Sequence, residues 1–205
     1  MSSRDRILAD VRRAIGGSAR SAPGPVERTY HRENLVARAD VDRFAEAVAE
    51  YRATVHRVDT DADLPALVAG LCAGESVVVP DDLPDSVIGT LDVHRDTAAR
   101  PLSVTELDGI TAVVTFGRLG IAATGTVVLD AGPGQGRRAL TLVPDHHVCV
   151  LRADQVVDTV PQAIAALDPV RPITLISGPS ATSDIELDRV EGVHGPRRLD
   201  VVIVG

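Results

Sequence analysis

Short, continuously apolar runs alternate with alanine-rich stretches from residue 54 to the end of the chain. The runs are rich in valine and isoleucine, as at 77–79, 175–176 and 201–204. Such runs are typical of strands in a parallel sheet whose two faces are both covered, because neither face then needs polar side chains. Strands that alternate with helices predict an α/β fold with a largely parallel sheet.

The same pattern places the individual elements. It predicts strands near 54–58, 76–79, 111–115, 126–130, 139–143, 147–151, 173–176 and 200–204, and helices over 61–73, 82–90 and 153–167. Between residues 126 and 151 three predicted strands follow one another with turns too short for helices. We therefore expect an antiparallel or hairpin insertion in this part of the sheet.

The first 53 residues are expected to form a helical arm and linker ahead of an α/β domain at 54–205. A helix over 2–15 has Ile7, Leu8, Val11 and Ile15 at helical spacing, and a Gly-, Ser- and Pro-rich stretch follows it. A second helix is expected over about 34–51. Two interpretations stay open: a solvated arm that covers the flank of the domain, or a docking arm for a partner subunit.

Composition excludes several classes of function. All 21 basic residues are arginine, so the chain cannot form a lysine Schiff base or complete a P-loop. A net charge of −8 and 2% aromatic residues disfavour a binder of nucleic acid or of anionic membranes. The two cysteines are too few for an iron–sulfur cluster. No apolar run approaches the length of a membrane helix, and we expect a cytoplasmic protein.

The densest group of unusual residues lies between 117 and 138. Thr124, Gly125 and Thr126 open a predicted strand, and a glycine-rich loop follows its end. The candidate ligand-binding residues of this group are Thr124, Gly125, Thr126, Gly134, Gln135, Gly136, Arg137 and Arg138. Glycine lets a backbone approach a ligand closely, and arginine binds carboxylate or phosphate oxygens through two nitrogens. The alternative is a β-turn with two surface arginines.

A second group follows the predicted strand at 173–176. Its candidate ligand-binding residues are Ser177, Gly178, Ser180 and Ser183, and its candidate acid or base residues are Asp184 and Glu186. In a parallel sheet, ligands bind at the carboxyl ends of strands, where such a loop would lie. The alternative is a capping loop that leads into a short helix.

Glu191 and His194 complete the candidate catalytic residues, since a histidine titrates near neutral pH. We predict that 124–126, 132–138 and 177–184 converge on one concave site. No metal site is expected: His146 and His147 are neighbours on a predicted strand and point to opposite faces, so one is expected to be buried and the other exposed.

Three segments together resemble the LUD (lactate utilization) domain family. They read T-G-T-V-V-L-D-A-G-P-G-Q-G-R-R from 124, I-S-G-P-S-A-T-S-D-I-E from 176 and V-E-G-V-H-G-P-R-R-L-D-V-V-I-V from 190. The resemblance implies a three-layer α/β domain of the NagB/RpiA/CoA-transferase-like type. It also implies a role in oxidising L-lactate to pyruvate together with partner proteins that carry iron–sulfur clusters. Many members have an acidic residue where this chain has Ala123, so its role is either missing or taken up by Asp184 or Glu186.

Three functions follow as hypotheses. The first is an accessory subunit of an iron–sulfur-dependent lactate-oxidising system that binds a small carboxylate or phosphate and holds no cofactor itself. The second is a stand-alone enzyme acting on a sugar phosphate or acyl-CoA, with Arg137 and Arg138 on the phosphate and Asp184, Glu186 or Glu191 as acid or base. The third is a non-catalytic module that senses a metabolite.

Overall fold

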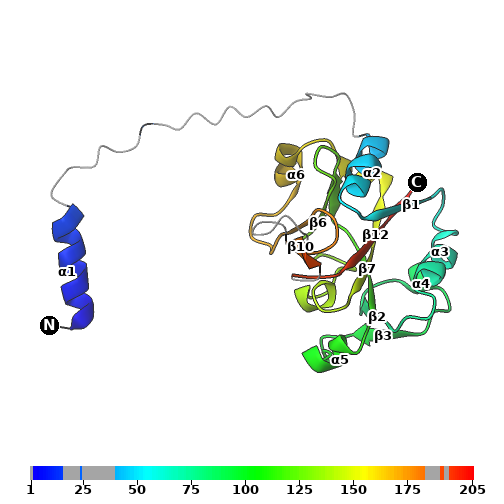
Figure 1. The fold of residues 1–205 in the computed structure, drawn as a ribbon, viewed down its shortest axis with the longest axis horizontal. Coiled ribbons are helices and arrows are strands. Elements are labelled where there is room, and N and C mark those ends of the chain that lie inside the picture. The colour runs from blue at the N-terminus through cyan, green and yellow to red at the C-terminus, as the bar shows by residue number, and fades with distance from the viewer. Residues whose placement is uncertain (1, 16–23, 25–39, 183–189, 192–193) are drawn as a thin grey trace. The chain divides into compact units, whose positions relative to one another are not determined.

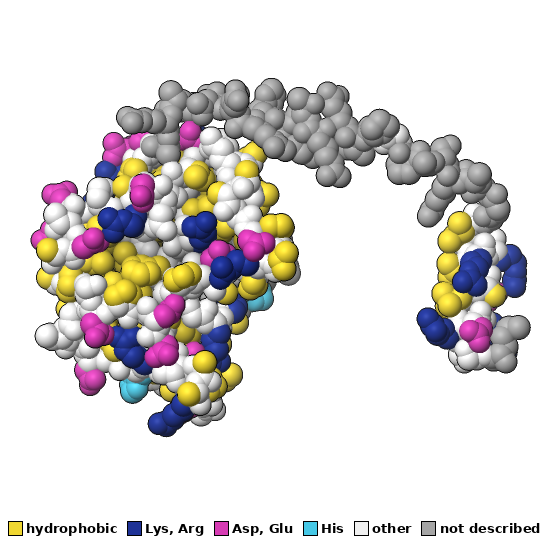
Figure 2. Space-filling model, turned by 180° about the vertical axis from the view of Figure 1, so that it is seen from behind, with side chains coloured by type: hydrophobic (Ala, Val, Ile, Leu, Met, Phe, Trp, Pro, Cys, Tyr) yellow, Lys and Arg dark blue, Asp and Glu magenta, His cyan; other side chains and the backbone are white. Residues whose placement is uncertain are grey.

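The computed structural model describes residues 2–15, 24, 40–182, 190–191 and 194–205. The chain divides into two compact units, Met1–His31 and Arg32–Gly205. In the first unit, helix α1 (Ser3–Ile15) has no buried residue. Its apolar residues Ile7, Leu8, Val11 and Ile15 are exposed and gather along one side of the helix (Figure 2).

A parallel sheet forms the centre of the second unit (Figure 1). Its strands lie in the order β1 (Thr54–Val58), β12 (Arg198–Val204), β7 (His146–Arg152), β4 (Ala112–Phe116), β2 (Val77–Pro80) and β3 (Val93–Asp96). Every neighbouring pair is parallel. The predicted α/β class with a largely parallel sheet is therefore confirmed.

Both faces of this sheet are buried, as the apolar runs predict. Val148 and Val150 of β7 pack with helices α3 (Leu64–Leu71) and α4 (Asp85–Ile88) on one face. Cys149 and Leu151 point to the other face and pack with helix α2 (Val41–Glu50). Helix α5 (Val104–Asp108) and the 3₁₀ helix η1 (Arg138–Thr141) cover that same face beside β2 and β4.

A second sheet lies against the α2 side. It consists of β8 (Val156–Val157), β5 (Leu119–Ile121), β6 (Thr126–Leu129) and β9 (Thr174–Ile176). Helix α6 (Val160–Ala166) packs on it through Ala163. The short 3₁₀ helix η2 (Ala153–Gln155) precedes β8, and β10 (Ala181–Thr182) pairs with β11 (Val190–Glu191). One face of the central sheet is thus covered by helices, and the other by helices together with this second sheet.

Two predicted elements are wrong. The run at 139–143 forms η1 instead of a strand, because Leu140 turns inward to pack with Val78 and Leu107. Of the three successive strands expected over 126–151, the first and the last form as β6 and β7, and only the middle one does not. Strand β6 pairs antiparallel with β5 and β9. The predicted helix at 153–167 is divided into η2, β8 and α6, and Thr159 caps the start of α6.

Helix α2, which the sequence analysis placed in the N-terminal arm, contributes to the core of the α/β domain. The side chains of Phe44 and Val48 on this helix are fully buried against the two sheets. Its N-cap is Asp40, whose side chain accepts hydrogen bonds from the first amides of the helix. None of the helices in the described part of the chain is both long enough and apolar enough to cross a bilayer.

Candidate functional site

A hollow of about 150 Å³ lies where β9 and the loops beside it face the first residues of β7 and β12. We call it the Arg138 hollow. Its lining residues are Arg138, Thr141, His147, Thr174, Leu175, Ile176, Ser177, Gly178, Pro179, Ser180, His194, Gly195, Pro196 and Leu199. They come from both sheets, from η1 and from the segment before β12. The hollow is much smaller than the usual pocket of about 300–1,000 Å³, so it suits a ligand of only a few heavy atoms.

Arg138 is the cation of this hollow. Its Nη1 donates to the carbonyl oxygen of Thr141 at 2.8 Å and to Oγ1 of Thr141 at 2.9 Å. Within the described residues, no carboxylate lies at ion-pair distance from it. Partial burial lowers the pKa of its guanidinium. An arginine held by η1 in this way can still present the rest of its planar group to an anion.

Hydroxyl groups follow one another from the T-G-T segment into the hollow. Oγ1 of Thr124 and Oγ1 of Thr126 are 2.7 Å apart, and Oγ1 of Thr126 is 2.8 Å from Oγ of Ser177. Ser180 ties two loops together, because its Oγ accepts from the backbone N–H of His194 and its N–H donates to the carbonyl oxygen of Pro196. The polar wall is therefore held in place by its own hydrogen bonds.

His147 is a buried, neutral side chain in the wall. Its Nε2 lies 2.8 Å from Oγ1 of Thr115. Burial lowers the pKa of His147 to about 3, and the nearby charges of His146 and Arg138 act in the same direction. At neutral pH the hollow thus combines one guanidinium with an uncharged imidazole and hydroxyl groups. That combination is suited to a small carboxylate that carries a hydroxyl or carbonyl group.

The structure brings several predicted residues together. Arg138, Ser177, Gly178, Ser180 and His194 all line the hollow, and Thr124 and Thr126 reach it through Ser177. The convergence predicted from the sequence holds for these positions.

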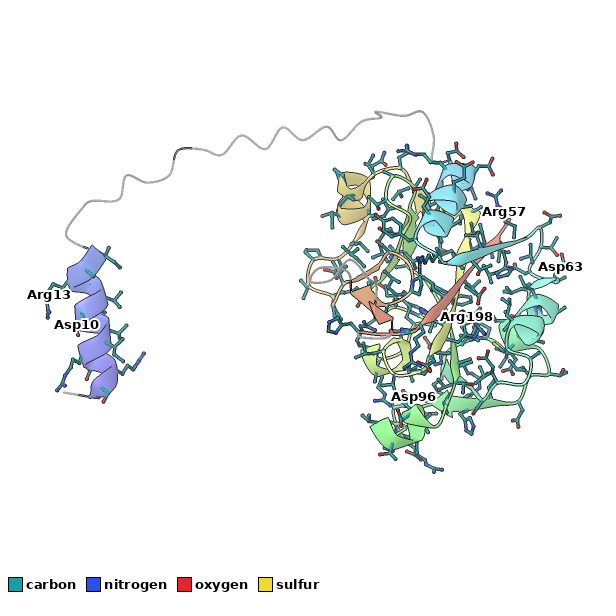
Figure 3. The ribbon with its side chains drawn as sticks, in the orientation of Figure 1. Asp10, Arg13, Arg57, Asp63, Asp96 and Arg198 are labelled. Atoms are coloured by element: carbon teal, nitrogen blue, oxygen red, sulfur yellow. The ribbon has the colours of Figure 1, made fainter. Side chains whose placement is uncertain are left out.

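The prediction that these segments meet at one site is wrong for Arg137. Its Nε and Nη2 each lie 2.8 Å from the carboxylate of Asp96, and Nη2 also donates to the carbonyl oxygen of Leu102. Asp96 lies at the end of β3, beside α5 (Figure 3). Arg137 lowers the pKa of this buried carboxyl group. Residues 137 and 138 diverge at the start of η1, so they cannot hold one anion together.

Most of the motif glycines have a packing role. A side chain at Gly125 would place its Cβ 2.4 Å from the backbone of Ala47 in α2, and one at Gly178 would meet the carbonyl oxygen of Tyr51 at 2.3 Å. Gly134 lies against the ring of Phe116, and Gly136 against Leu140. All four have positive φ angles. These contacts explain the glycines without a ligand.

Gln135 is also a structural residue. Its side chain is buried, accepts from the N–H of Asp130 and donates to Oδ1 of Asp130. Gln135 and Gly136 line a smaller hollow of about 120 Å³ that shares Arg138, Thr141 and Thr174 with the Arg138 hollow.

Ser183, Asp184 and Glu186 lie outside the described residues. Glu191 is described only through its backbone, which pairs with Ala181. Their proposed roles stay predictions. Sequence reasoning missed Thr141 and His147 as lining residues. The sequence indicated that one of His146 and His147 is buried, but not which one or what it faces.

His146 and His147 are both buried, so the expected exposure of one of them is wrong. The reason is that both faces of β7 are covered. His146 Nε2 lies 2.7 Å from Asp200, whose other oxygen lies 2.7 Å from Nε2 of His56. Glu75 and Arg198, the latter on β12 (Figure 3), complete this polar cluster on the His146 side. Among the described residues, no group of acidic, histidine and cysteine side chains has the arrangement of a metal site.

Comparison with known proteins shows which family has this architecture. The model of the LUD domain matches residues 41–204. Lactate utilization protein C of Deinococcus radiodurans is 43% identical over 97% of this chain and 94% of that protein. The uncharacterized protein YkgG of Escherichia coli is 26% identical over 100% of this chain and 99% of its own length. The crystal structure of a DUF162 family protein from Deinococcus radiodurans, 39% identical, superposes with a TM-score of 0.68 over 80% of this chain and 96% of that one. The chain belongs to the LUD domain family.

Proposed function

We propose that this chain acts in lactate utilization as an accessory component that binds a small carboxylate, lactate or pyruvate, in the Arg138 hollow. The observation that carries the proposal is the convergence of Arg138, Ser177 and His194 on a hollow of about 150 Å³. The guanidinium binds the carboxylate through two nitrogens, and the hydroxyl and imidazole groups bind the oxygen on the neighbouring carbon. The name of the similar Deinococcus protein supports the choice of ligand.

The chemistry of the cysteines supports an accessory role. Oxidation of lactate releases two electrons, and we propose that they pass to an iron–sulfur protein that associates with this chain. Cys72 and Cys149 are both buried and pack in different parts of the core. Burial raises the pKa of each thiol to about 12, so both stay protonated at neutral pH. Protonated, separated thiols do not provide the thiolate set that a cluster needs.

Calorimetric titration of the full chain with L-lactate and with pyruvate tests the binding step. We expect saturable binding at one ligand per chain, and Arg138→Gln should weaken it at least about tenfold, because a charge-assisted hydrogen bond is lost. Arg57→Gln serves as the matched control, since Arg57 forms an exposed ion pair with Asp42 and does not line the hollow. Equal affinity of the Arg138 variant and the wild type would refute the site.

The partner is tested separately. The full chain, purified by affinity from cells grown on lactate, should carry with it a protein that has the visible absorbance of iron–sulfur clusters. Recovery of the chain alone under conditions that preserve such complexes would contradict the accessory role but leave ligand binding in place.

A further inference from the structure

A larger cavity, of about 480 Å³, lies at the carboxyl ends of the central strands. We call it the carboxyl-edge cavity. It is lined by the last residues of β4, β7 and β12, including Phe116, Leu151 and Val204, and by Ser86 of α4. Arg138, Ser177 and His194 do not line it. Its volume falls within the range of about 300–1,000 Å³ that is typical of small-molecule sites.

The topology of the sheet marks this position. From β2 the chain moves outward to β3, and it then returns to β4, β7 and β12 on the other side of β2. The direction of winding therefore reverses between β2 and β4. The connection after β2 brings Ser86 to the cavity, and the connection after β4 brings Gly117 and Arg118. In open parallel sheets, ligands bind outside the carboxyl ends of the strands at such a reversal.

Two arginines line this cavity, and one glutamine side chain binds the backbone at both of them. The side chain of Gln155 donates to the carbonyl oxygens of Gly117 and Arg118, and it accepts from the N–H of Arg152 at 2.7 Å. Arg118 and Arg152, at the ends of neighbouring strands β4 and β7, are thus linked through one side chain. These bonds hold the two backbones, and both arginines line the cavity from them. Two guanidinium groups that start from neighbouring strand ends are suited to the several oxygens of a phosphate.

The contacts that these two arginine side chains make in the structure are exposed or long. Nη1 of Arg152 lies 2.9 Å from Asp61, but the side chains are 56% and 68% exposed. Nε of Arg118 lies 3.6 Å from Oδ2 of Asp130, beyond hydrogen-bond length. The exposed Arg152–Asp61 pair contributes little to stability, so a phosphate can replace it at small cost. Arg118 also donates from Nη2 to the carbonyl oxygen of Ala166 at 3.5 Å. Asp130 is buried, but it keeps Gln135 and Arg171 as partners when Arg118 binds a phosphate.

Asp61 and Gln135 also line the cavity, and much of the remaining lining is apolar. Val87, Val150 and Leu64 form it together with the ring of Phe116, which is one of only four aromatic side chains in the chain. A half-buried aromatic ring at a cavity wall offers a face for a planar ligand ring.

From the topology, the paired arginines and the aromatic wall, we propose that the carboxyl-edge cavity binds a nucleotide, with its base in the apolar part and its phosphate on Arg118 and Arg152. This site is separate from the Arg138 hollow and does not depend on the function proposed for it.

Calorimetric titration of the full chain with AMP, adenosine and inorganic phosphate tests the proposal. AMP should bind saturably at one per chain, and adenosine and phosphate should each bind at least about tenfold more weakly, because each lacks one part of the ligand. Arg118→Gln and Arg152→Gln should each weaken AMP binding about tenfold or more. Ser86→Trp, at an exposed position of α4 on the cavity wall, should block it without a change of charge.

Arg197→Gln is the matched control, because Arg197 pairs with Asp145 ahead of the first residues of β12 and β7 and does not line the cavity. It should bind AMP like the wild type, and the thermal unfolding temperature of every variant reports on folding. Absence of saturable AMP binding would overturn the proposal. So would phosphate binding as tight as that of AMP, or wild-type affinity in a folded Arg118 or Arg152 variant.

Discussion

Gly125 has a backbone conformation and a neighbour that only glycine accommodates. Its φ is +55°, and a Cβ there would lie 2.4 Å from the backbone of Ala47. We expect Gly125→Ala to lower the free energy of unfolding by about 3–4 kcal/mol, from the left-handed conformation together with the clash. Gly74→Ala is the control, because Gly74 has φ +78° and nothing within 4 Å of its Cβ, and it should cost about 1–2 kcal/mol. Equal losses of unfolding free energy for the two variants in urea denaturation would contradict the close packing of Gly125 against Ala47 of α2.

Asp200 links stability to pH. Burial raises its pKa, but hydrogen bonds to His146 and His56 outweigh that effect, so the pKa lies below 3.8. A lowered pKa in the folded state contributes stability above about pH 4, and this contribution is lost as the pH falls through the folded value. Asp200→Asn should therefore destabilise the chain by about 2–3 kcal/mol at pH 7. The difference from the wild type should shrink steadily below pH 4, and an unchanged difference in urea denaturation there would contradict the ionised role of Asp200.

The two adjacent arginines at the end of the loop between β6 and η1 have different roles. Arg137 fastens this loop to β3 through Asp96, and Arg138 faces the hollow. We expect Arg137→Gln to lower the free energy of unfolding by about 1–2 kcal/mol, a value reduced by the partial exposure of Arg137. The same variant should bind carboxylate as the wild type does in calorimetry. Loss of binding without loss of stability would reverse the assignment of the two residues.

The N-terminal helix is expected to contribute little to the stability of the α/β domain. Since α1 has no buried residue, deletion of residues 1–20 should leave the thermal unfolding temperature nearly unchanged. Removal of the apolar face of α1 should nevertheless weaken the association of the chain with a second copy or with a partner protein, as measured by sedimentation velocity. A large fall in the unfolding temperature would show that α1 belongs to the core, and unchanged association would exclude a docking role for it.

The parallel sheet was predictable because its inner strands are buried on both faces, which leaves uninterrupted apolar runs such as 201–204. Edge strand β3 reads V-H-R-D and escaped prediction, since an edge needs no such run. Strand β5, L-G-I, is too short for a pattern, and its glycine accommodates the ring of Phe44. The run at 139–143 was predicted as a strand although it forms η1, because a short apolar segment fits a turn as well as a strand.

Part of the candidate site was predictable from residue chemistry. Ser177, Ser180 and His194 follow or precede strands that the sequence identifies. They do not meet at the carboxyl edge of a parallel sheet as predicted, because β9 belongs to the second sheet and pairs antiparallel with β6. The different directions of Arg137 and Arg138 could not be derived, because they depend on η1 and on a distant carboxylate, Asp96. The carboxyl-edge cavity was missed for a similar reason: its arginines are far apart in sequence and come together through the pairing of β4 with β7 and the backbone hydrogen bonds of Gln155.

The most direct test of the proposed role is a crystal structure of the full chain grown with pyruvate. We predict that the carboxylate lies in the Arg138 hollow, with its oxygens at hydrogen-bond distance from the guanidinium of Arg138 and its keto oxygen near Ser177 or His194. Pyruvate bound at another place, or an empty hollow at a pyruvate concentration that saturates the chain in solution, would contradict the account.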